Sequence, residues 1–323
     1  MPQFSLLIPV YDGKKTLPRL LESLCNCRPG VSFEAIFAVE PGFPDDIAIL
    51  EDAASRDERI RFLANQERLG PMRSRERCLS IATGDYIAFA DCDDYLSPDF
   101  FLLMHEGFRL GADCVQCSFC VDRQGSVKPD PFSYKKRKLL SGEEAAYALL
   151  LDKAVRGFIW NKAFKRVDLL THPAIVLPGR FEDMAFVFPF FLNAEKVAFI
   201  PERLYFYSKS GEGETDRNPR SRPFEHLASL ASIRHYVDMY RPSFRKLFEK
   251  SRLRSFLSLA YDWHLARKAG AEAEELDEVW ACFKKIYGPG LMPLEGRGYS
   301  PYLSPAIPYR SLAERIEKGK ESI

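Results

Sequence analysis

The sequence of 323 residues contains no long uncharged hydrophobic run and no strong excess of charge of either sign. A membrane-spanning helix needs about 18–20 apolar residues, and no run approaches that length. The first residues, MPQFSLLIPVY, lack the charged region that opens a signal peptide. A formal net charge of +1 excludes a general preference for polyanions. We therefore expect a cytoplasmic protein whose membrane contact is at most peripheral, at the inner face.

The sequence also lacks the spacing of a disulfide framework or of a cysteine-based metal site. Its eight cysteines are spread over a long chain, and several lie inside apolar runs. Cys114, Cys117 and Cys120 fall in a predicted strand, where a step of three residues alternates faces and separates the thiols. No fourth ligand stands nearby, as tetrahedral zinc requires. We expect reduced, buried thiols that pack as small hydrophobic side chains.

Strand and helix signals alternate through the N-terminal third of the chain. This alternation predicts a mostly parallel sheet with helices on both faces, in which ligands bind beyond the carboxyl ends of the strands. The predicted strands are residues 4–11, 33–40, 60–64 and 86–91, and helices are predicted near residues 17–24, 45–55, 72–82 and 98–109. The carboxyl ends of these strands contain Pro9, Val10 and Tyr11, then Glu40, then residues 91–94.

A nicotinamide dehydrogenase would show the same alternation of strands and helices. That class needs a Gly-x-Gly-x-x-Gly turn after the first strand, whereas residues 11–17 contain only Gly13. The sequence therefore excludes it.

Beyond residue 121 the alternation of strand and helix signals is less regular. The chain as a whole divides into three predicted parts. They are an α/β catalytic domain at 1–215, a helical C-terminal region at 216–287 and a proline-rich irregular tail at 288–323. Ser141 and Glu144 have the spacing of a capping box at a helix start. A further strand is predicted at 113–121, a helix at 181–193 and short strands at 197–201 and 204–208. Residues 209–222 are polar and rich in Gly, Arg and Pro, which indicates a loop.

An acidic cluster of Asp91, Asp93 and Asp94, interrupted by Cys92, follows the fourth predicted strand. Crowded carboxylates repel one another and raise one another's pKa, and a divalent cation removes that cost. Ligands that are all oxygen suit Mg²⁺ or Mn²⁺, which share their remaining sites with substrate phosphates. A solvated turn, or caps for the next helix, remains an open alternative because spacing alone does not decide between them.

Three segments together resemble the family 2 glycosyltransferases of the GT-A fold. They are Ser-Leu-Leu-Ile-Pro-Val-Tyr at 5–11, Gly-Asp-Tyr-Ile-Ala-Phe-Ala-Asp-Cys-Asp-Asp at 84–94, and Phe-Glu-Asp at 181–183. Residues 69–75 also resemble a segment of that family, and Trp-Asn-Lys at 160–162 is similar to a stretch of its bacterial polysaccharide and lipopolysaccharide members. The resemblance implies a Rossmann-like nucleotide-diphospho-sugar transferase fold, with a mixed sheet flanked by helices and a C-terminal helical appendage.

The resemblance also implies roles for individual residues. Asp183 would be the general base that takes the proton from an acceptor hydroxyl, and Glu182 would orient the acceptor or pair with a cation. Asp93 would bind the metal that bridges the diphosphate, helped by Asp91 and Asp94. The donor site would further comprise Pro9, Val10 and Tyr11 as the floor of the nucleobase pocket, Glu40, Arg75, Asp91 near the ribose, and Cys92.

Three positions depart from the family's pattern. Glu40 and Pro41 stand where the family has two acids, so one acid is lost, although Glu40 still offers an acceptor to a uracil-type N–H. Glu76 replaces a familiar Asn. Ser208 stands where an arginine often meets phosphate, and basic residues of the 209–222 loop are candidates to replace it.

The implied function is an inverting glycosyltransferase that uses Mn²⁺ or Mg²⁺. It would move a sugar from a nucleotide-diphosphate donor, a UDP-sugar by family habit, to a glycan or lipid-linked glycan in cell-surface polysaccharide synthesis. Because of the departures, a catalytically silent relative that binds a sugar nucleotide or a glycan is the alternative. Trp160 has two open interpretations, a platform for a sugar ring or a core residue.

The region 216–254 is basic, with ten Lys or Arg against four Asp or Glu. Such a partly helical stretch suits peripheral contact with anionic lipid, and a solvated helix face is the alternative. Nucleic acid is not an expected partner, because no known binding module surrounds these residues.

Overall fold

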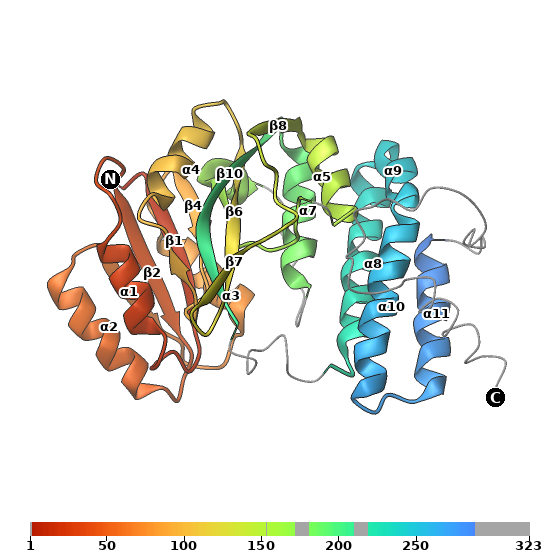
Figure 1. Cartoon of the computed structure of the whole chain (residues 1–323), viewed down its shortest axis with the longest axis horizontal. Coiled ribbons are helices and arrows are strands. Elements are labelled where there is room, and N and C mark those ends of the chain that lie inside the picture. Colours follow the sequence, from red (N-terminus) through yellow and green to blue (C-terminus); the bar gives the residue numbers. More distant parts are fainter. Residues whose placement is uncertain (1, 153, 172–180, 210–218, 288–323) are drawn as a thin grey trace. The chain divides into compact units, whose positions relative to one another are not determined.

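The computed structural model describes residues 2–152, 154–171, 181–209 and 219–287 (Figure 1). The chain divides into two compact units. The first contains residues 1–146, 157–178 and 182–213, and the second contains residues 147–156, 179–181 and 214–323. The predicted tail at 288–323 and most of the predicted loop at 209–222 lie outside the described residues.

The N-terminal half of the first unit has the predicted alternation of strands and helices. Parallel pairing joins the strands in the order β3-β2-β1-β4. Almost every residue of β1 and β2 is buried, because both faces of the sheet are covered. The elements are β1 (Phe4–Val10), α1 (Leu17–Cys25), β2 (Phe33–Val39), α2 (Pro44–Arg56), β3 (Ile60–Ala64), α3 (Pro71–Ile81) and β4 (Tyr86–Phe89).

The second half of the sheet is mixed in direction. β9 (Lys162–Lys165) runs antiparallel between β4 and β6 (Cys114–Arg123), and β10 (Lys196–Ser208) runs parallel to β6. β5 (Tyr95–Leu96) forms the antiparallel edge, so the order is β3-β2-β1-β4-β9-β6-β10-β5. The alternation alone predicted a mostly parallel sheet; the mixed sheet implied by the resemblance is the one observed.

Two short strands and four helices complete the first unit. β7 (Ser126–Pro129) pairs with β6, and β8 (Lys138–Ser141) pairs with β10. The helices are α4 (Phe100–Phe108), α5 (Gly142–Leu150), α6 (Arg166–Thr171) and α7 (Glu182–Asn193), with the last turn of α5 assigned to the second unit. The predicted capping box is present at α5: Ser141 N–H donates to Glu144 Oε2 at 2.8 Å, and Glu144 N–H donates to Ser141 Oγ at 3.3 Å.

Four of the eight cysteines (residues 78, 114, 117 and 120) and Trp160 are buried, as a core interpretation predicts, whereas Cys25 is exposed and the other three cysteines are partly buried. All eight cysteines are free thiols, and Cys114 and Cys117 are fully buried on β6. Trp160 is 4% exposed, and its ring stacks on Tyr205 with centroids 4.4 Å apart. Trp160 is therefore a core residue in this structure, which removes the basis for its proposed stacking on a sugar.

The second unit is a helical bundle, as predicted. Its elements are α8 (Arg222–Tyr240), a 3₁₀ turn at Pro242–Phe244, α9 (Arg245–Lys250), α10 (Arg252–Lys268) and α11 (Ala273–Tyr287). α8 packs against both α10 and α11. Among the described residues, no helix combines the length and the apolar character needed to cross a bilayer.

Many cations of the basic region 216–254 are paired with acids of the same unit. The pairs include Arg222 with the nearly buried Asp262, and Arg254 with Asp152. This pairing reduces the net positive charge that the region presents to anionic lipid, and it favours the interpretation as a solvated helix face. Arg220, Arg234 and Arg245 also form ion pairs.

Candidate active site

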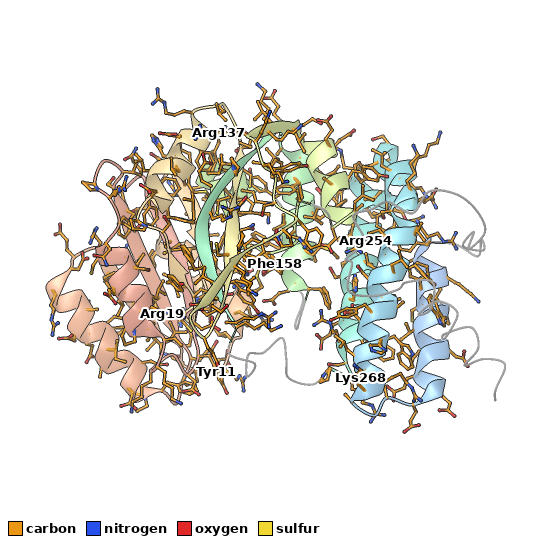
Figure 2. All side chains as sticks on the ribbon, in the orientation of Figure 1. Tyr11, Arg19, Arg137, Phe158, Arg254 and Lys268 are labelled. Atoms are coloured by element: carbon orange, nitrogen blue, oxygen red, sulfur yellow. The ribbon has the colours of Figure 1, made fainter. Side chains whose placement is uncertain are left out.

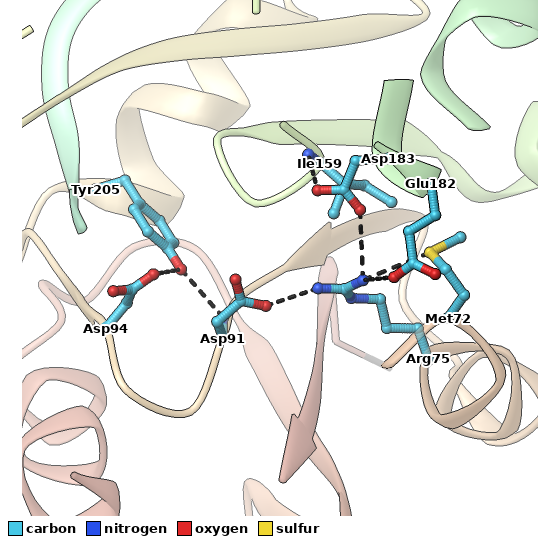
Figure 3. A network of polar contacts seen from close by, with 8 residues as sticks. All are labelled: Met72, Arg75, Asp91, Asp94, Ile159, Glu182, Asp183 and Tyr205. Atoms are coloured by element: carbon cyan, nitrogen blue, oxygen red, sulfur yellow. Dashed lines mark hydrogen bonds and ion pairs between the residues drawn. The ribbon is translucent and has the colours of Figure 1, made fainter. Parts of the chain in front are cut away.

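The acidic cluster forms a loop between β4 and β5 that is fastened to β10. The backbone N–H of Asp91 donates to the hydroxyl of Tyr205 at 3.0 Å. Tyr205 is fully buried on β10, and its hydroxyl donates to Asp94 Oδ2 at 2.6 Å. One tyrosine therefore fixes both ends of the loop, as Figure 3 shows. Sequence reasoning missed Tyr205, which has no local pattern to mark it.

Asp94 is wholly buried, and both of its carboxylate oxygens accept hydrogen bonds from β10. Besides the bond from Tyr205, Oδ1 accepts the backbone N–H of Ser208 at 2.7 Å. Burial, with the charges of Asp93 and Asp91, raises the pKa of Asp94 well above its ordinary value. The structure thus gives Asp94 a role in fixing the loop, and it is the least available of the three predicted metal ligands.

Asp93 is the carboxylate of the loop that remains available. No hydrogen bond joins its side chain to another side chain of the described residues, and it is only partly exposed. Burial raises the pKa of Asp93 to about 6, and the charge of Asp91 adds to the shift. A group in this state gains most from a neighbouring cation.

Arg19 of α1 contacts the backbone of Asp93, and sequence reasoning missed it. Its Nη2 donates to the backbone carbonyl of Asp93 at 2.7 Å and also to the hydroxyl of Ser208. Its guanidinium lies over the ring of Tyr95, 4.6 Å from the centroid. Figure 2 places Arg19 and Tyr11 near the same end of the sheet. In the sequence, Arg19 looks like any solvated residue of an amphipathic helix.

A buried arginine joins the acidic loop to the predicted base (Figure 3). Arg75 of α3 is 5% exposed, and its Nη2 donates to Asp91 Oδ1 at 2.6 Å. Its Nη1 lies 3.5 Å from Asp183 Oδ1 and 3.7 Å from Glu182 Oε1. Burial lowers the pKa of Arg75, but the three carboxylates outweigh burial and raise it above its ordinary value. The guanidinium is therefore always charged, and it brings together residues 75, 91, 182 and 183, all of which the sequence analysis named as candidate site residues.

Asp183 lies in the first turn of α7, after a residue with unusual backbone geometry. Phe181 has a φ of 66°, the left-handed region, which turns the chain sharply into the helix. Besides its contact with Arg75, Asp183 accepts the backbone N–H of Ile159 on Oδ2 at 3.1 Å. Burial raises the pKa of Asp183, and Arg75 acts against that rise. A carboxylate with a raised pKa and two fixed partners has the properties of a general base.

The predicted nucleobase residues differ in how available they are. Val10 is fully buried, whereas Tyr11 is 41% exposed and meets Phe43 edge to face, with centroids 4.7 Å apart. The guanidinium of Arg68 lies over the Tyr11 ring, 4.6 Å from its centroid. Pro9 is only partly buried. Tyr11, Phe43 and Arg68 therefore form an exposed aromatic and cationic surface at this end of β1.

Glu40 is occupied by contacts within the chain. It is 4% exposed, and its carboxylate accepts the N–H groups of Leu69 and Gly70 at 3.0 and 2.9 Å and the hydroxyl of Ser74 at 2.9 Å. These are contacts to the N-terminus of α3, where a negative charge is stabilising. Glu40 thus fixes the helix that carries Arg75, a role that the sequence did not suggest.

Cys92 is a partly buried, protonated thiol. Burial raises its pKa, with the charge of Asp93 as the next cause. Its side chain packs against the core of the sheet. Cys92 contributes packing to this site rather than a reactive group.

The carboxylates of this chain fit a cation that arrives with a diphosphate. The described residues hold no group of three or more Asp, Glu, His or Cys side chains placed to bind a metal ion by themselves. Asp94 is engaged with β10 and Asp91 with Arg75, which leaves Asp93 as the main candidate ligand. Mg²⁺ and Mn²⁺ are commonly held by one or two carboxylates together with substrate phosphates, and Asp93 beside Asp91 matches that pattern.

Comparison with known proteins agrees with this geometry. The family described as glycosyl transferase family 2 matches residues 5–158. The uncharacterized glycosyltransferase EpsJ of Bacillus subtilis is 31% identical over 255 residues, which cover 73% of this chain and 71% of EpsJ. The poly(ribitol-phosphate) beta-N-acetylglucosaminyltransferase TarS of Staphylococcus aureus is 23% identical over 66% of this chain and 37% of its own length.

Solved structures show the same fold. S. aureus TarS in complex with UDP-GlcNAc superposes with a TM-score of 0.61 at 15% identity, covering 98% of this chain and 92% of that one. The mannosyltransferase PcManGT of Pyrobaculum calidifontis, in complex with GDP-Man and Mn²⁺, gives a TM-score of 0.55 at 13% identity, covering 99% and 86%. The relatives of this chain, together with its sheet order and acidic loop, show that it belongs to the family 2 glycosyltransferases, with the GT-A fold.

Proposed function

We propose that this enzyme transfers a sugar, with inversion, from a UDP-sugar to a hydroxyl of a glycan or lipid-linked glycan acceptor in cell-surface polysaccharide synthesis. One observation carries the proposal: the buried Arg75 joins Asp91, at the carboxyl edge of the sheet, to Asp183 at the head of α7. Arg75 thus contacts both Asp91 on the donor side and the proposed base Asp183, so that only one guanidinium separates the two carboxylates.

In the proposed reaction Asp183 removes the proton of the acceptor hydroxyl. The acceptor oxygen forms a bond to the anomeric carbon as the bond from that carbon to the diphosphate breaks, and the nucleoside diphosphate leaves. Arg75 and the Ile159 amide orient Asp183 for this step, and both act against the rise that burial causes in its pKa. A positioned carboxylate contributes about 10²–10⁴-fold to such a rate. Glu182 is 8% exposed and lies beside Arg75, so it adds a negative charge to the same site.

On the donor side, Asp93 with Asp91 would hold Mn²⁺ or Mg²⁺. When bound, that metal neutralises charge on the leaving diphosphate. The exposed ring of Tyr11 offers a stacking surface to the nucleobase, flanked by Phe43 and Arg68. The choice of a uridine nucleotide is supported by the relative TarS, whose structure is a complex with UDP-GlcNAc.

The test is turnover and thermal stability with a panel of sugar nucleotides, each with and without Mn²⁺. We expect a UDP-sugar to stabilise the wild type only with Mn²⁺. Asp183→Asn should keep that stabilisation and lose about 10³-fold in kcat, whereas Asp93→Ala should lose the stabilisation. Asp45→Asn, whose side chain is 63% exposed, is the matched control and should change neither.

Equal turnover by the wild type and Asp183→Asn would refute the assigned base. Stabilisation by a sugar nucleotide without turnover by the wild type would instead favour a silent binding relative. We would attribute such a result to Glu40, because its carboxylate is bound by the start of α3 and is not free to contact the nucleobase.

A further inference from the structure

Lys162 is a fully buried lysine that the proposed reaction does not use. It opens β9, has no exposed surface, and lies near the buried thiols of Cys114 and Cys117. A buried ammonium is costly unless hydrogen bonds and opposite charge compensate it. Burial lowers the pKa of Lys162 to about 7, and the nearby charge of Asp183 is among the influences that oppose the shift.

The hydrogen bonds of Lys162 hold a tight turn. Its Nζ donates to the backbone carbonyl of Phe158 and, at 2.9 Å, to Oδ1 of Asn161. Its backbone N–H donates to the carbonyl of Ile159 at 3.1 Å. One residue therefore closes the turn 158–161 from both its side chain and its backbone.

Asn161 ties the same turn to the centre of the sheet. Its Nδ2 donates to the carbonyl of Cys117 on β6 at 3.0 Å, and its own carbonyl accepts the Cys117 N–H at 2.9 Å. Asn161 is 1% exposed, so these bonds are shielded from water. Losing either partner would leave a buried polar group unsatisfied.

The opposite side of the turn meets the predicted base. The Ile159 N–H donates to Asp183 Oδ2 at 3.1 Å. Gly157 lies so close to α7 that a Cβ there would stand 2.9 Å from Cβ of Met184, the residue after Asp183. The turn is thus in direct contact with the first turn of α7 and supplies one of the two hydrogen-bond partners of Asp183.

We propose that Lys162 and Asn161 are positioning residues that fix the 157–161 turn and, through the Ile159 amide, orient Asp183 for catalysis. This inference rests on the proposed function, because it assigns the reason for the orientation of its base. It also gives the Trp-Asn-Lys segment a role within the site: Trp160 packs in the core and the next two residues hold the turn.

The first test is Lys162→Met, which keeps the apolar stem and removes the donors. Lys165→Met, in the same strand, is the matched control, because Lys165 pairs with Asp113 at 2.6 Å at the surface of the unit. We expect Lys162→Met to lower kcat about ten- to a hundredfold with donor affinity unchanged, and to move the acidic limb of the pH profile to higher pH. Lys165→Met should leave the limb in place.

A double-mutant cycle decides whether Lys162 acts through Asp183. In an Asp183→Asn background, Lys162→Met should cause little further loss of kcat, because the base is already absent. Additive losses, or an unchanged kcat and limb in a folded Lys162→Met protein, would overturn the proposal. Should Lys162→Met fail to fold, Asn161→Ala makes the smaller change and should move kcat and the limb in the same direction.

Hydrogen exchange tests the inference without turnover. In the wild-type protein without ligands, the Ile159 amide should exchange slowly, and Lys162→Met and Asp183→Ala should each speed its exchange about tenfold or more. Lys165→Met should not. Unchanged protection in Lys162→Met would refute the inference, even where the enzyme is active. Absence of turnover by the wild type refutes the proposed function and leaves this measurement to decide the inference by itself.

Discussion

The acidic loop at 91–94 and the head of α7 both hold carboxylates out of water, but with different partners. Asp94 is held by a tyrosine hydroxyl and a backbone amide, which are neutral donors. Asp183 lies beside the buried guanidinium of Arg75 and near Lys162. The charge of Asp94 is therefore met only by neutral donors among these contacts, whereas the Arg75 guanidinium opposes the rise that burial causes in the pKa of Asp183.

The largest effect on this difference between the two regions is expected from removing Arg75, the cation that contacts both of them. Arg75→Met should leave Asp91, Glu182 and Asp183 uncompensated, because all three lie within ion-pair distance of its guanidinium. We expect a loss of about 3–5 kcal/mol in the free energy of unfolding, as for other broken buried ion pairs. The pKa of Asp183 should rise, so that turnover falls most at low pH. Urea denaturation and a pH profile measure these effects.

Arg73→Met is the matched control for that experiment. Arg73 is in the same helix and is exposed. Its replacement should change unfolding by at most about 0.5 kcal/mol. Equal stability of the Arg75 and Arg73 variants would show that the buried cation does not compensate the three acids.

A smaller effect is expected from titrating the loop alone. The pKa of Asp93 is raised to about 6 from an ordinary 3.8, so in the absence of metal its contribution to stability is present at low pH and is lost as pH rises through about 6. Asp93→Asn, which mimics the protonated acid, should therefore be more stable than the metal-free wild type above that pH and equal to it near pH 4 or below.

The metal response should have the opposite pH dependence. A protonated carboxyl does not bind a divalent cation, so stabilisation of the wild type by Mn²⁺ and UDP should disappear as pH falls through about 6. Thermal unfolding from acid to neutral pH measures both trends. A stabilisation by Mn²⁺ and UDP that survives in Asp93→Asn would remove Asp93 from the metal site.

The smallest expected effect comes from the neutral donor. Tyr205→Phe removes the hydroxyl that joins Asp94 to the Asp91 backbone while keeping the ring that stacks on Trp160. We expect a loss of about 1–3 kcal/mol, since the buried Asp94 oxygen loses its partner. Tyr207→Phe, on the same strand, is the control. A loss no larger than that of the control would show that Tyr205 does not fix the loop.

The parallel half of the sheet was predictable because its strands are short apolar runs, of which β1 and β2 are buried on both faces. β9 was not, because Lys-Ala-Phe-Lys looks polar, and its burial depends on its place in the sheet between β4 and β6. The region 197–208 was predicted as two strands around Pro201. It forms the single strand β10, whose pairing with β6 shifts register between Ile200 and Tyr205.

In the site, the resemblance marked Asp91, Asp93 and Asp183 through contiguous motifs. It did not show that Arg75 bridges two of them, since 16 and 108 positions separate Arg75 from Asp91 and Asp183. Arg19 and Tyr205 were missed for a similar reason: each is a single side chain whose partners lie far along the chain. Contacts of this kind follow from the topology of the sheet and leave no local pattern.

The hydrogen bonds from the start of α3 to Glu40 matter for any attempt to change which nucleotide-sugar donor the protein prefers. Any replacement chosen to read a different base would also loosen the helix that delivers Arg75 to the network. Under the proposed function, altered nucleotide selectivity is therefore best sought at Phe43 and Arg68, which contact Tyr11 and lie outside that helix. Under the proposed function, position 40 is coupled to reactivity through α3, and the surface formed by Tyr11, Phe43 and Arg68 is where nucleotide recognition can change independently.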